Sequence, residues 1–538
     1  MEKSAAFSRR QALGLGAAGA ITLFGLPALL SACTTGGTAK TPSIGLGPEL
    51  ANPPVRTASG GKLGGTLTAK WGEVDLGLGR PVKTYVYNGA IPGETWDLKP
   101  GETIAIELVN DLPPLTSSQQ AESDDHHQTG AETGSEGAAN LTRPHAWTTT
   151  NLHTHGLHVS PSDTEQGAGD NVFLVLEPGG RQRYNITIPE DHTGGFFWYH
   201  PHHHGGVKQQ VRGGLAGALI IRGEIDEVPE VAAATERIFV LQDIELTGEF
   251  TLAEPRPEDP NGNYWPDAQE FWIINGQYRP TVTMQPGEVQ RWRFVNAAAS
   301  NMALVSLAGH PLNVLAYDGY TLDAPEVTDA IELVPGGRVE LLVKAGDIGM
   351  YDLTLLPGDQ TPITPPTPGS DGYTSASSLG RTIATIVVEG AQLDMGLPKS
   401  LPAYNPPVLP IARKRSVNWE SINDAKGNFL ALGIDHEAFD PDKPPYQMQL
   451  GTAEEWHVED MDDGFTHIFH IHINPFLVTE INGQPLAKPQ WRDTFPLGPH
   501  DFTMQMNLVD FTGKYVDHCH YVDHEDMGMM EAVEVVDA

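Results

Sequence analysis

Four short segments of the 538-residue chain concentrate side chains that can bind a metal. They are His153-Thr154-His155-Gly156, His200-Pro201-His202, His467-Ile468-Phe469-His470-Ile471-His472, and His518-Cys519-His520 followed by His524. Residues i and i+2 of a strand point to the same face, so each His-x-His pair delivers two imidazoles to one place. Imidazole with a thiolate suits copper, and two histidines, a cysteine and a weak thioether form the blue-copper pattern. The spacing therefore predicts copper chemistry on β-strands.

The elements that position these side chains are predicted to be short strands. The chain has 58 Gly and 43 Pro, which separate many short runs containing Val, Ile and Thr. Alternating runs at 103–108 and 291–295 indicate half-buried strands.

Only two cysteines are present, which excludes a disulfide framework. The formal net charge of −36 argues against nucleic acid as a partner, because phosphate binding needs a basic surface.

An internal repeat organises the chain. Asn88-Gly89 is followed by Pro100-Gly101-Glu102 and an alternating run, and Asn275-Gly276 is followed by Pro286-Gly287-Glu288 and another. A weaker third copy leads from Leu450-Gly451-Thr452 to Trp456. A sequence pattern that recurs in this way marks a repeated structural unit. We therefore predict three related β-sandwiches, at 62–225, 226–399 and 400–538, of which the second has no histidine-rich segment.

The four motifs together resemble those of the multicopper oxidases, a family that includes laccases, cuprous oxidases, bilirubin oxidases and spore-coat laccases. The resemblance covers about residues 65–538. It implies an all-β chain of three tandem cupredoxin-like Greek-key β-sandwich domains. It also implies four copper ions (one type 1, one type 2 and two type 3), with dioxygen as the electron acceptor.

The family pattern assigns a ligand set to each copper. The type 1 copper takes His467, Cys519 and His524, with Met529 as the axial residue and Met527 and Met530 as nearby competitors. The type 2 copper takes His153 and His470, one type 3 copper takes His155, His200 and His520, and the other takes His202, His472 and His518. No ligand position is substituted, which favours an active oxidase over the copper-free structural members of the family.

Reduction of dioxygen to water consumes protons, so a carboxylate is expected near the three-copper cluster. Glu525, directly after His524, matches an acidic residue that many family members carry there. Asp170 is the second candidate and Asp163 is its rival.

The reducing substrate is open between three alternatives, of which laccase-like oxidation is our first expectation and a metallo-oxidase the second. A laccase-like enzyme would oxidise phenols and aromatic amines in an open, partly apolar pocket near His467 or His524. A metallo-oxidase would oxidise Cu(I), Fe(II) or Mn(II); the chain lacks a Met-rich insertion before the third motif, but Glu459, Asp460, Asp462 and Asp463 precede His467 and would attract cations. A copper-binding envelope protein without turnover is the third alternative.

The N-terminus is predicted to be an export signal followed by a tether. Ser8-Arg9-Arg10 precedes a weakly apolar run and resembles a twin-arginine signal, and Leu30-Ser31-Ala32-Cys33 resembles a lipobox. We expect cleavage after residue 32, a lipid on Cys33 as the only membrane attachment, and a cell-envelope or periplasmic location. Residues 34–61 are expected to be a flexible tether.

Two internal segments are expected to be surface loops: a polar insertion at 116–142, which contains His126 and His127, and a segment at 358–380.

Overall fold

The computed structural model describes residues 46–116, 144–255, 268–356, 380–425, 427, 429–462, 466–498 and 501–537. Several predicted features lie outside the described residues: the signal with Cys33, most of the insertion that contains His126 and His127, most of the 358–380 segment, and Asp463. No helix within these described ranges is long and apolar enough to cross a membrane.

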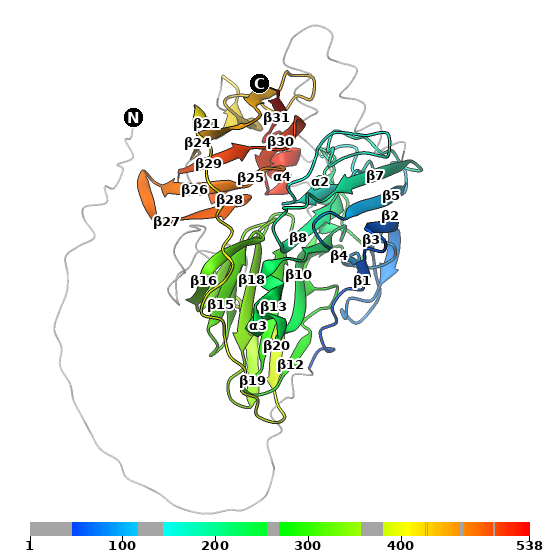
Figure 1. Ribbon diagram of the computed structural model, residues 1–538. Coiled ribbons are helices and arrows are strands. Elements are labelled where there is room, and N and C mark those ends of the chain that lie inside the picture. Colours follow the sequence, from blue (N-terminus) through cyan, green and yellow to red (C-terminus); the bar gives the residue numbers. More distant parts are fainter. Residues whose placement is uncertain are drawn as a thin grey trace, which may run out of the picture. The chain divides into compact units, whose positions relative to one another are not determined.

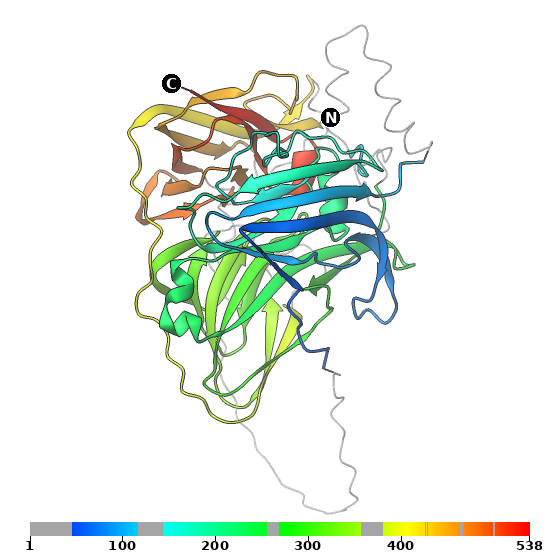
Figure 2. The same cartoon turned by 45° about the vertical axis from the view of Figure 1, so that its right-hand side comes forward.

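The first sandwich is built from two sheets that share one hydrophobic core (Figures 1 and 2). Strand β5 alternates buried and partly exposed residues over most of its length, which confirms the pattern read at 103–108. One sheet has the order β3 (Val82–Tyr87), β2 (Lys62–Val74), β5 (Thr103–Asp111) and β7 (Arg181–Thr187). The other has the order β1 (Val55–Thr57), β4 (Thr95–Leu98), β9 (Gly217–Ile221), β8 (Gly195–His200) and β6 (His153–His155).

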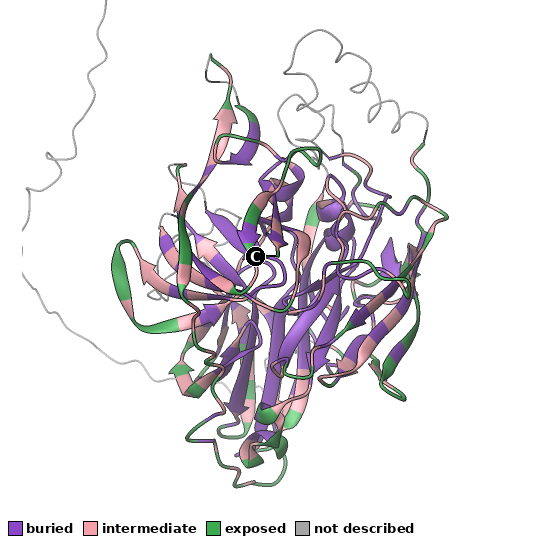
Figure 3. Ribbon diagram, turned by 45° about the horizontal axis from the view of Figure 1, so that its top comes forward, coloured by how far each residue is buried: buried purple, intermediate pink, exposed green. Residues whose placement is uncertain are grey.

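The second sandwich has a six-stranded and a five-stranded sheet, and most residues of its central strands are buried (Figure 3). The larger sheet has the order β11 (Gln269–Ile274), β10 (Thr235–Leu246), β13 (Val289–Asn296), β18 (Arg338–Lys344), β15 (Leu312–Tyr317) and β16 (Tyr320–Thr328). The smaller has the order β12 (Thr281–Met284), β20 (Arg381–Val388), β19 (Gly349–Leu355), β14 (Ala303–Leu307) and β17 (Ala330–Leu333).

The third sandwich repeats the strand order of the second. Its larger sheet is β22 (Phe429–Ile434), β21 (Ile411–Asn423), β24 (Thr452–Asp460), β29 (Phe502–Leu508), β26 (Phe476–Ile481) and β27 (Gln484–Arg492). Its smaller sheet is β23 (Tyr446–Gln449), β31 (Met530–Val536), β30 (Gly513–Cys519), β25 (His467–Ile471) and β28 (Thr494–Leu497). Short helices lie between strands: α2 (Val207–Arg212), η2 (Glu224–Glu227), α3 (Pro229–Ala232) and α4 (Val522–Asp526). The predicted all-β class with three cupredoxin-like sandwiches is confirmed.

The same kind of turn occurs once in each of the three sandwiches. Asn88-Gly89 and Asn275-Gly276 both have positive φ, as a tight hairpin turn requires. Each asparagine side chain accepts a backbone N–H of the neighbouring strand, from Thr68 and Val240 respectively, at 2.9 Å. In the third sandwich Asp435-His436 takes this place, with φ of 51° and 70°. The sequence pattern missed this copy because neither residue there is Asn or Gly.

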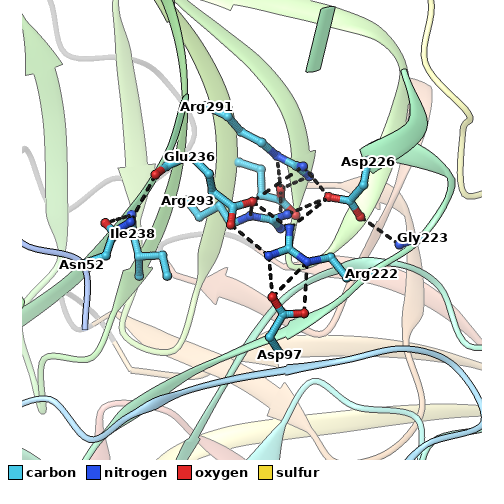
Figure 4. A network of polar contacts seen from close by, with 10 residues as sticks. Asn52, Asp97, Arg222, Gly223, Asp226, Glu236, Ile238, Arg291 and Arg293 are labelled. Carbon is cyan, nitrogen blue, oxygen red and sulfur yellow. Dashed lines mark hydrogen bonds and ion pairs between the residues drawn. The ribbon is translucent and has the colours of Figure 1, made fainter. Parts of the chain in front are cut away.

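Two expectations about local structure are wrong. Strand β13 is buried on both faces, because Arg291 and Arg293 enter an ionic network with Asp226, Glu236 and Glu340 (Figure 4). The same network reaches the first sandwich through the Arg222–Asp97 ion pair at 2.6 Å. The tether is also shorter than residues 34–61, since β1 pairs with β4 and Leu50 is buried in the core of the second sandwich.

Candidate metal centre

Strand register brings the four motifs together as pairs. His153 on β6 lies opposite His200 on β8 in the first sandwich, and His470 on β25 lies opposite His518 on β30 in the third. Phe469 lies opposite Cys519, so the thiol and the flanking histidines leave opposite faces of β30. Cys519 belongs to the core of the third sandwich, whereas the rings of His518 and His520 contact histidines of the first. Two separate sites result, joined through one cysteine.

The first site is a triangle of two imidazole nitrogens and a sulfur. His467 Nδ1 lies 3.0 Å from His524 Nδ1, and Cys519 Sγ lies 3.8 and 3.6 Å from these two atoms. The backbone N–H of Ile468 donates to the sulfur at 3.4 Å. Burial raises the pKa of the Cys519 thiol well above its usual value. A coordinated cation reverses this effect, because the thiolate is the metal-binding form.

The three methionines close to this triangle in the sequence differ in their packing. Met529 is buried in the same core cluster as Cys519, and its carbonyl accepts the Cys519 N–H at 3.0 Å. Met530 packs in a different cluster with Val172, Phe439 and Val516. Met527 is only partly buried.

The second site contains a triangle of imidazole nitrogens. The Nε2 atoms of His202, His472 and His518 lie 3.1 to 3.3 Å from one another. His518 Nδ1 donates to the carbonyl of Cys519 at 3.0 Å, because a carbonyl can only accept. His518 Nε2 is therefore a lone-pair donor directed at the other two nitrogens. Convergent lone pairs of this kind fit a cation.

Backbone carbonyls direct further histidines in the same way. His200 Nδ1 donates to Pro201 O at 2.9 Å and His470 Nδ1 donates to Asp493 O at 2.7 Å. Their Nε2 atoms are buried and have no hydrogen-bond partner among the described residues. Burial lowers the pKa of both rings, to about 3 for His200 and well below the usual value for His470. Both are thus held neutral, the form that binds a metal.

The remaining rings complete the cluster. Ring centroids of His155, His200 and His520 lie 4.9 to 5.7 Å apart, and His153 and His470 lie 5.9 Å apart. Groups whose ligand atoms lie within 4.8 Å of one another include His202-His472-His518, His467-Cys519-His524 and His153-His470-His472. Buried imidazoles with free lone pairs, together with a single thiolate, form a donor set that fits copper.

The two carboxylates named from the sequence both lie at this cluster. Asp170 Oδ2 is 2.9 Å from His153 Nδ1, and its Oδ1 accepts the Thr154 backbone N–H at 2.8 Å. Burial raises the pKa of Asp170 to about 7. Glu525 lies 3.3 Å from His202 Nδ1 and 3.2 Å from His518 Nδ1. The rival, Asp163, is exposed and accepts a hydrogen bond from Asn171 instead.

Sequence reasoning missed one carboxylate of the cluster. Asp493, just before β28, offers its carbonyl to His470, and its carboxylate lies 3.5 Å from His155 Nε2. No histidine or cysteine stands near it in the sequence, so no local pattern marked it.

Comparison with known proteins identifies the family. Three family models, each described as multicopper oxidase, match residues 131–225, 249–369 and 404–538. The chain belongs to the multicopper oxidase family. A multicopper oxidase of Staphylococcus aureus is 23% identical over 87% of this chain and 88% of its own. The laccase of Bacillus subtilis is 24% identical over 85% of this chain and 91% of its own.

Solved structures share the fold of this multicopper oxidase. A metallo-oxidase of Campylobacter jejuni superposes with a TM-score of 0.70 at 22% identity, covering 92% of this chain and 96% of that one. A Pediococcus acidilactici multicopper oxidase also gives 0.70, at 21% identity and 92% coverage of both chains. Membership of the multicopper oxidase family, shown by the three family models, makes the protein an oxidoreductase that uses dioxygen as acceptor and four copper ions as cofactors.

Proposed function

We propose that His467, Cys519 and His524 hold the type 1 copper, with Met529 beside it. The other eight motif histidines hold the three-copper cluster, in the type 2 and type 3 sets given above. The observation that carries this assignment is the convergence of mostly buried imidazole nitrogens with one thiol in two adjacent groups. Copper bound there supplies one-electron transfer at the type 1 site and four-electron reduction of dioxygen at the cluster.

The protein's own groups fix the ligands and prepare proton transfer. Carbonyls of Pro201, Asp493 and Cys519 hold three imidazoles in the tautomer that leaves Nε2 free. Glu525, between His202 and His518, is placed to orient both rings and to give a proton to reduced oxygen. Asp170 does the same for His153.

A substitution at Glu525 tests the proton role. Glu525→Gln keeps the shape of the side chain but removes the acid, so all four coppers should remain bound while reoxidation slows. The measurement is to reduce the enzyme without oxygen, mix it with oxygen, and follow the return of the blue colour. Equal reoxidation rates, or loss of copper from the variant, would assign Glu525 a structural role.

For the reducing substrate we propose a metal cation, Fe(II) or Cu(I). Asp460 Oδ1 and Asp462 Oδ2 lie 3.8 and 3.9 Å from His467 Nε2, on the edge of the ligand that faces away from the copper-binding Nδ1. Met461, between them, is 53% exposed and offers a thioether. Carboxylates suit Fe(II), a soft thioether suits Cu(I), and the chain's net charge of −36 favours the approach of cations.

The second candidate is laccase-like oxidation of phenols and aromatic amines. His524 is only partly buried. Two partly buried residues stand near it in the chain: Tyr521, whose ring lies 5.3 Å from that of His524, and Met527. This edge gives an aromatic substrate an apolar approach to a type 1 ligand.

Oxygen consumption with each substrate separates the candidates. The purified, copper-loaded protein is supplied with Fe(II), Cu(I) or a neutral phenol at matched concentrations. A kcat/KM at least tenfold higher for a metal ion supports the metallo-oxidase proposal. The reverse ratio supports the laccase-like candidate, and no consumption with any substrate contradicts both.

Export and lipidation of Cys33 remain part of the proposal. Wild type and Cys33→Ala, expressed with the full N-terminus, should differ in membrane association after cell fractionation. Equal association would contradict the lipid anchor.

A further inference from the structure

The second sandwich carries no predicted copper ligand, yet one of its turns reaches the three-copper cluster. This turn, residues 334–337, joins β17 to β18. Gly336 has a φ of +80°, and a Cβ there would lie 2.8 Å from His520 Nε2 and 3.0 Å from His155 Cε1. The backbone of the turn therefore lies directly against two rings of the cluster.

Arg338, two residues further, is fully buried and joins all three sandwiches. Its Nε donates to Phe196 O of the first sandwich at 3.3 Å. Within the second sandwich it donates to Gly336 O and Asp318 O, both at 3.1 Å. Its two terminal nitrogens donate to the carboxylate of Asp493 in the third, at 2.7 and 2.5 Å. All five guanidinium N–H groups are thus used, which only arginine can achieve.

Asp493 carries this contact on to the ligands. Its carbonyl accepts the Nδ1–H of His470, and its carboxylate lies 3.5 Å from His155 Nε2. Gly156, directly after His155, packs on the same ion pair: a Cβ there would lie 2.2 Å from Arg338 Nη2. The Arg338–Asp493 pair therefore contacts the cluster from the first and the third sandwich at once.

We propose that Gly336 and Arg338 are positioning residues for the three-copper cluster, through which the ligand-free second sandwich sets the placement of His155, His470 and His520. This inference rests on the ligand set proposed above. Arg338 holds the backbone at Asp493, and thereby the tautomer and direction of His470. Gly336 leaves the space that the rings of His155 and His520 occupy.

A general contribution to folding is the alternative, and the chain offers a matched control for it. Arg291 lies in the same sandwich, is also buried, and pairs with Glu340 at 2.6 Å. Its ion pairs within the described part of the chain lead to the Figure 4 network and to none of the motif histidines. Arg291→Lys should lower the melting temperature without changing the copper sites.

The test compares Arg338→Lys, Gly336→Ala and Arg291→Lys with wild type, each loaded with copper. Total copper per chain, type 1 visible absorption, the type 2 electron paramagnetic resonance signal and melting temperature are measured. We expect Arg338→Lys and Gly336→Ala to keep the type 1 absorption per chain and to lose half or more of the type 2 signal or of the cluster copper. Arg291→Lys should keep both signals.

Two results would overturn the inference. One is four coppers with an unchanged type 2 signal in both Arg338→Lys and Gly336→Ala. The other is a parallel loss of type 1 and type 2 signals in both, which would assign these residues to the fold as a whole. A wild type that binds copper but lacks a type 2 signal would instead refute the proposed ligand set, and this inference with it.

Discussion

The carboxylates beside His467 give the sharpest test of the substrate proposal. Asp462 Oδ2 accepts a hydrogen bond from Ser421 at 2.7 Å, and its interactions with His467 and Ser421 lower its pKa, so it is ionised at neutral pH. A divalent ion about 4 Å away is attracted by roughly 2 kcal/mol in bulk water, and by more in a lower dielectric. Since about 1.4 kcal/mol corresponds to a factor of ten, Asp462→Asn should raise the KM for Fe(II) about 10- to 30-fold.

Steady-state oxygen consumption against Fe(II) concentration at low ionic strength measures this change. Glu73→Gln, at an exposed position on β2 of the first sandwich, removes the same charge elsewhere and should leave KM unchanged. With a neutral phenol, Asp462→Asn should match wild type, which separates lost cation binding from an altered type 1 potential. Added salt should reduce the Fe(II) difference, because the partly exposed charge of Asp462 is screened by ions in solution. An Fe(II) KM within twofold of wild type would refute the reasoning.

Three further predictions concern the copper ligands and the second sandwich. Cys519→Ser should abolish the blue absorption and oxidase activity while circular dichroism stays that of a β-protein; a blue variant would contradict the type 1 assignment. Met529→Leu should raise the type 1 potential in a redox titration and Met527→Leu should not, because loss of an axial thioether destabilises Cu(II); the opposite result would move the axial position to Met527. Burial and neighbouring carboxylates raise the pKa of Asp243 from 3.8 to about 7, so the folded state keeps a proton that the unfolded state releases. Stability to urea should therefore fall by about 1.4 kcal/mol per unit as the pH rises from about 4 to 7, and Asp243→Asn should show a flatter profile; identical profiles would contradict the shift.

The fold and most of the site could be predicted because their signals are local. A His-x-His pair on a strand converges whatever surrounds it, and Cys519 between two histidines separates the two sites by strand alternation alone. The repeat was visible because the first and second sandwiches both form this turn with an Asn-Gly pair. Where the same turn is made by Asp435-His436, with positive φ at both residues, the Asn-Gly pattern is absent from the sequence.

Contacts between distant residues were beyond the sequence pattern. Asp170 and Asp163 are seven positions apart in one loop, and only the fold brings the first to His153 and leaves the second exposed. Asp493 and Arg338 are separated by 155 residues, and neither lies in a motif. Tertiary partners decide such roles, so the type of a residue and its near neighbours cannot reveal them.

The arginines of the second sandwich show why periodicity fails in such places. A polar residue at every second position of a strand normally indicates a face in water. Arg291 and Arg293 follow that pattern, yet both are buried because Glu340 and Asp226 supply opposite charges from other elements. Breaking such a buried pair leaves an unpaired charge in the interior, which is strongly destabilising. Arg291→Lys keeps the positive charge but loses the planar guanidinium group, so it measures how much the geometry of that group contributes to stability. Arg338→Lys makes the same change beside the copper cluster, and there it measures the contribution of the geometry to copper binding.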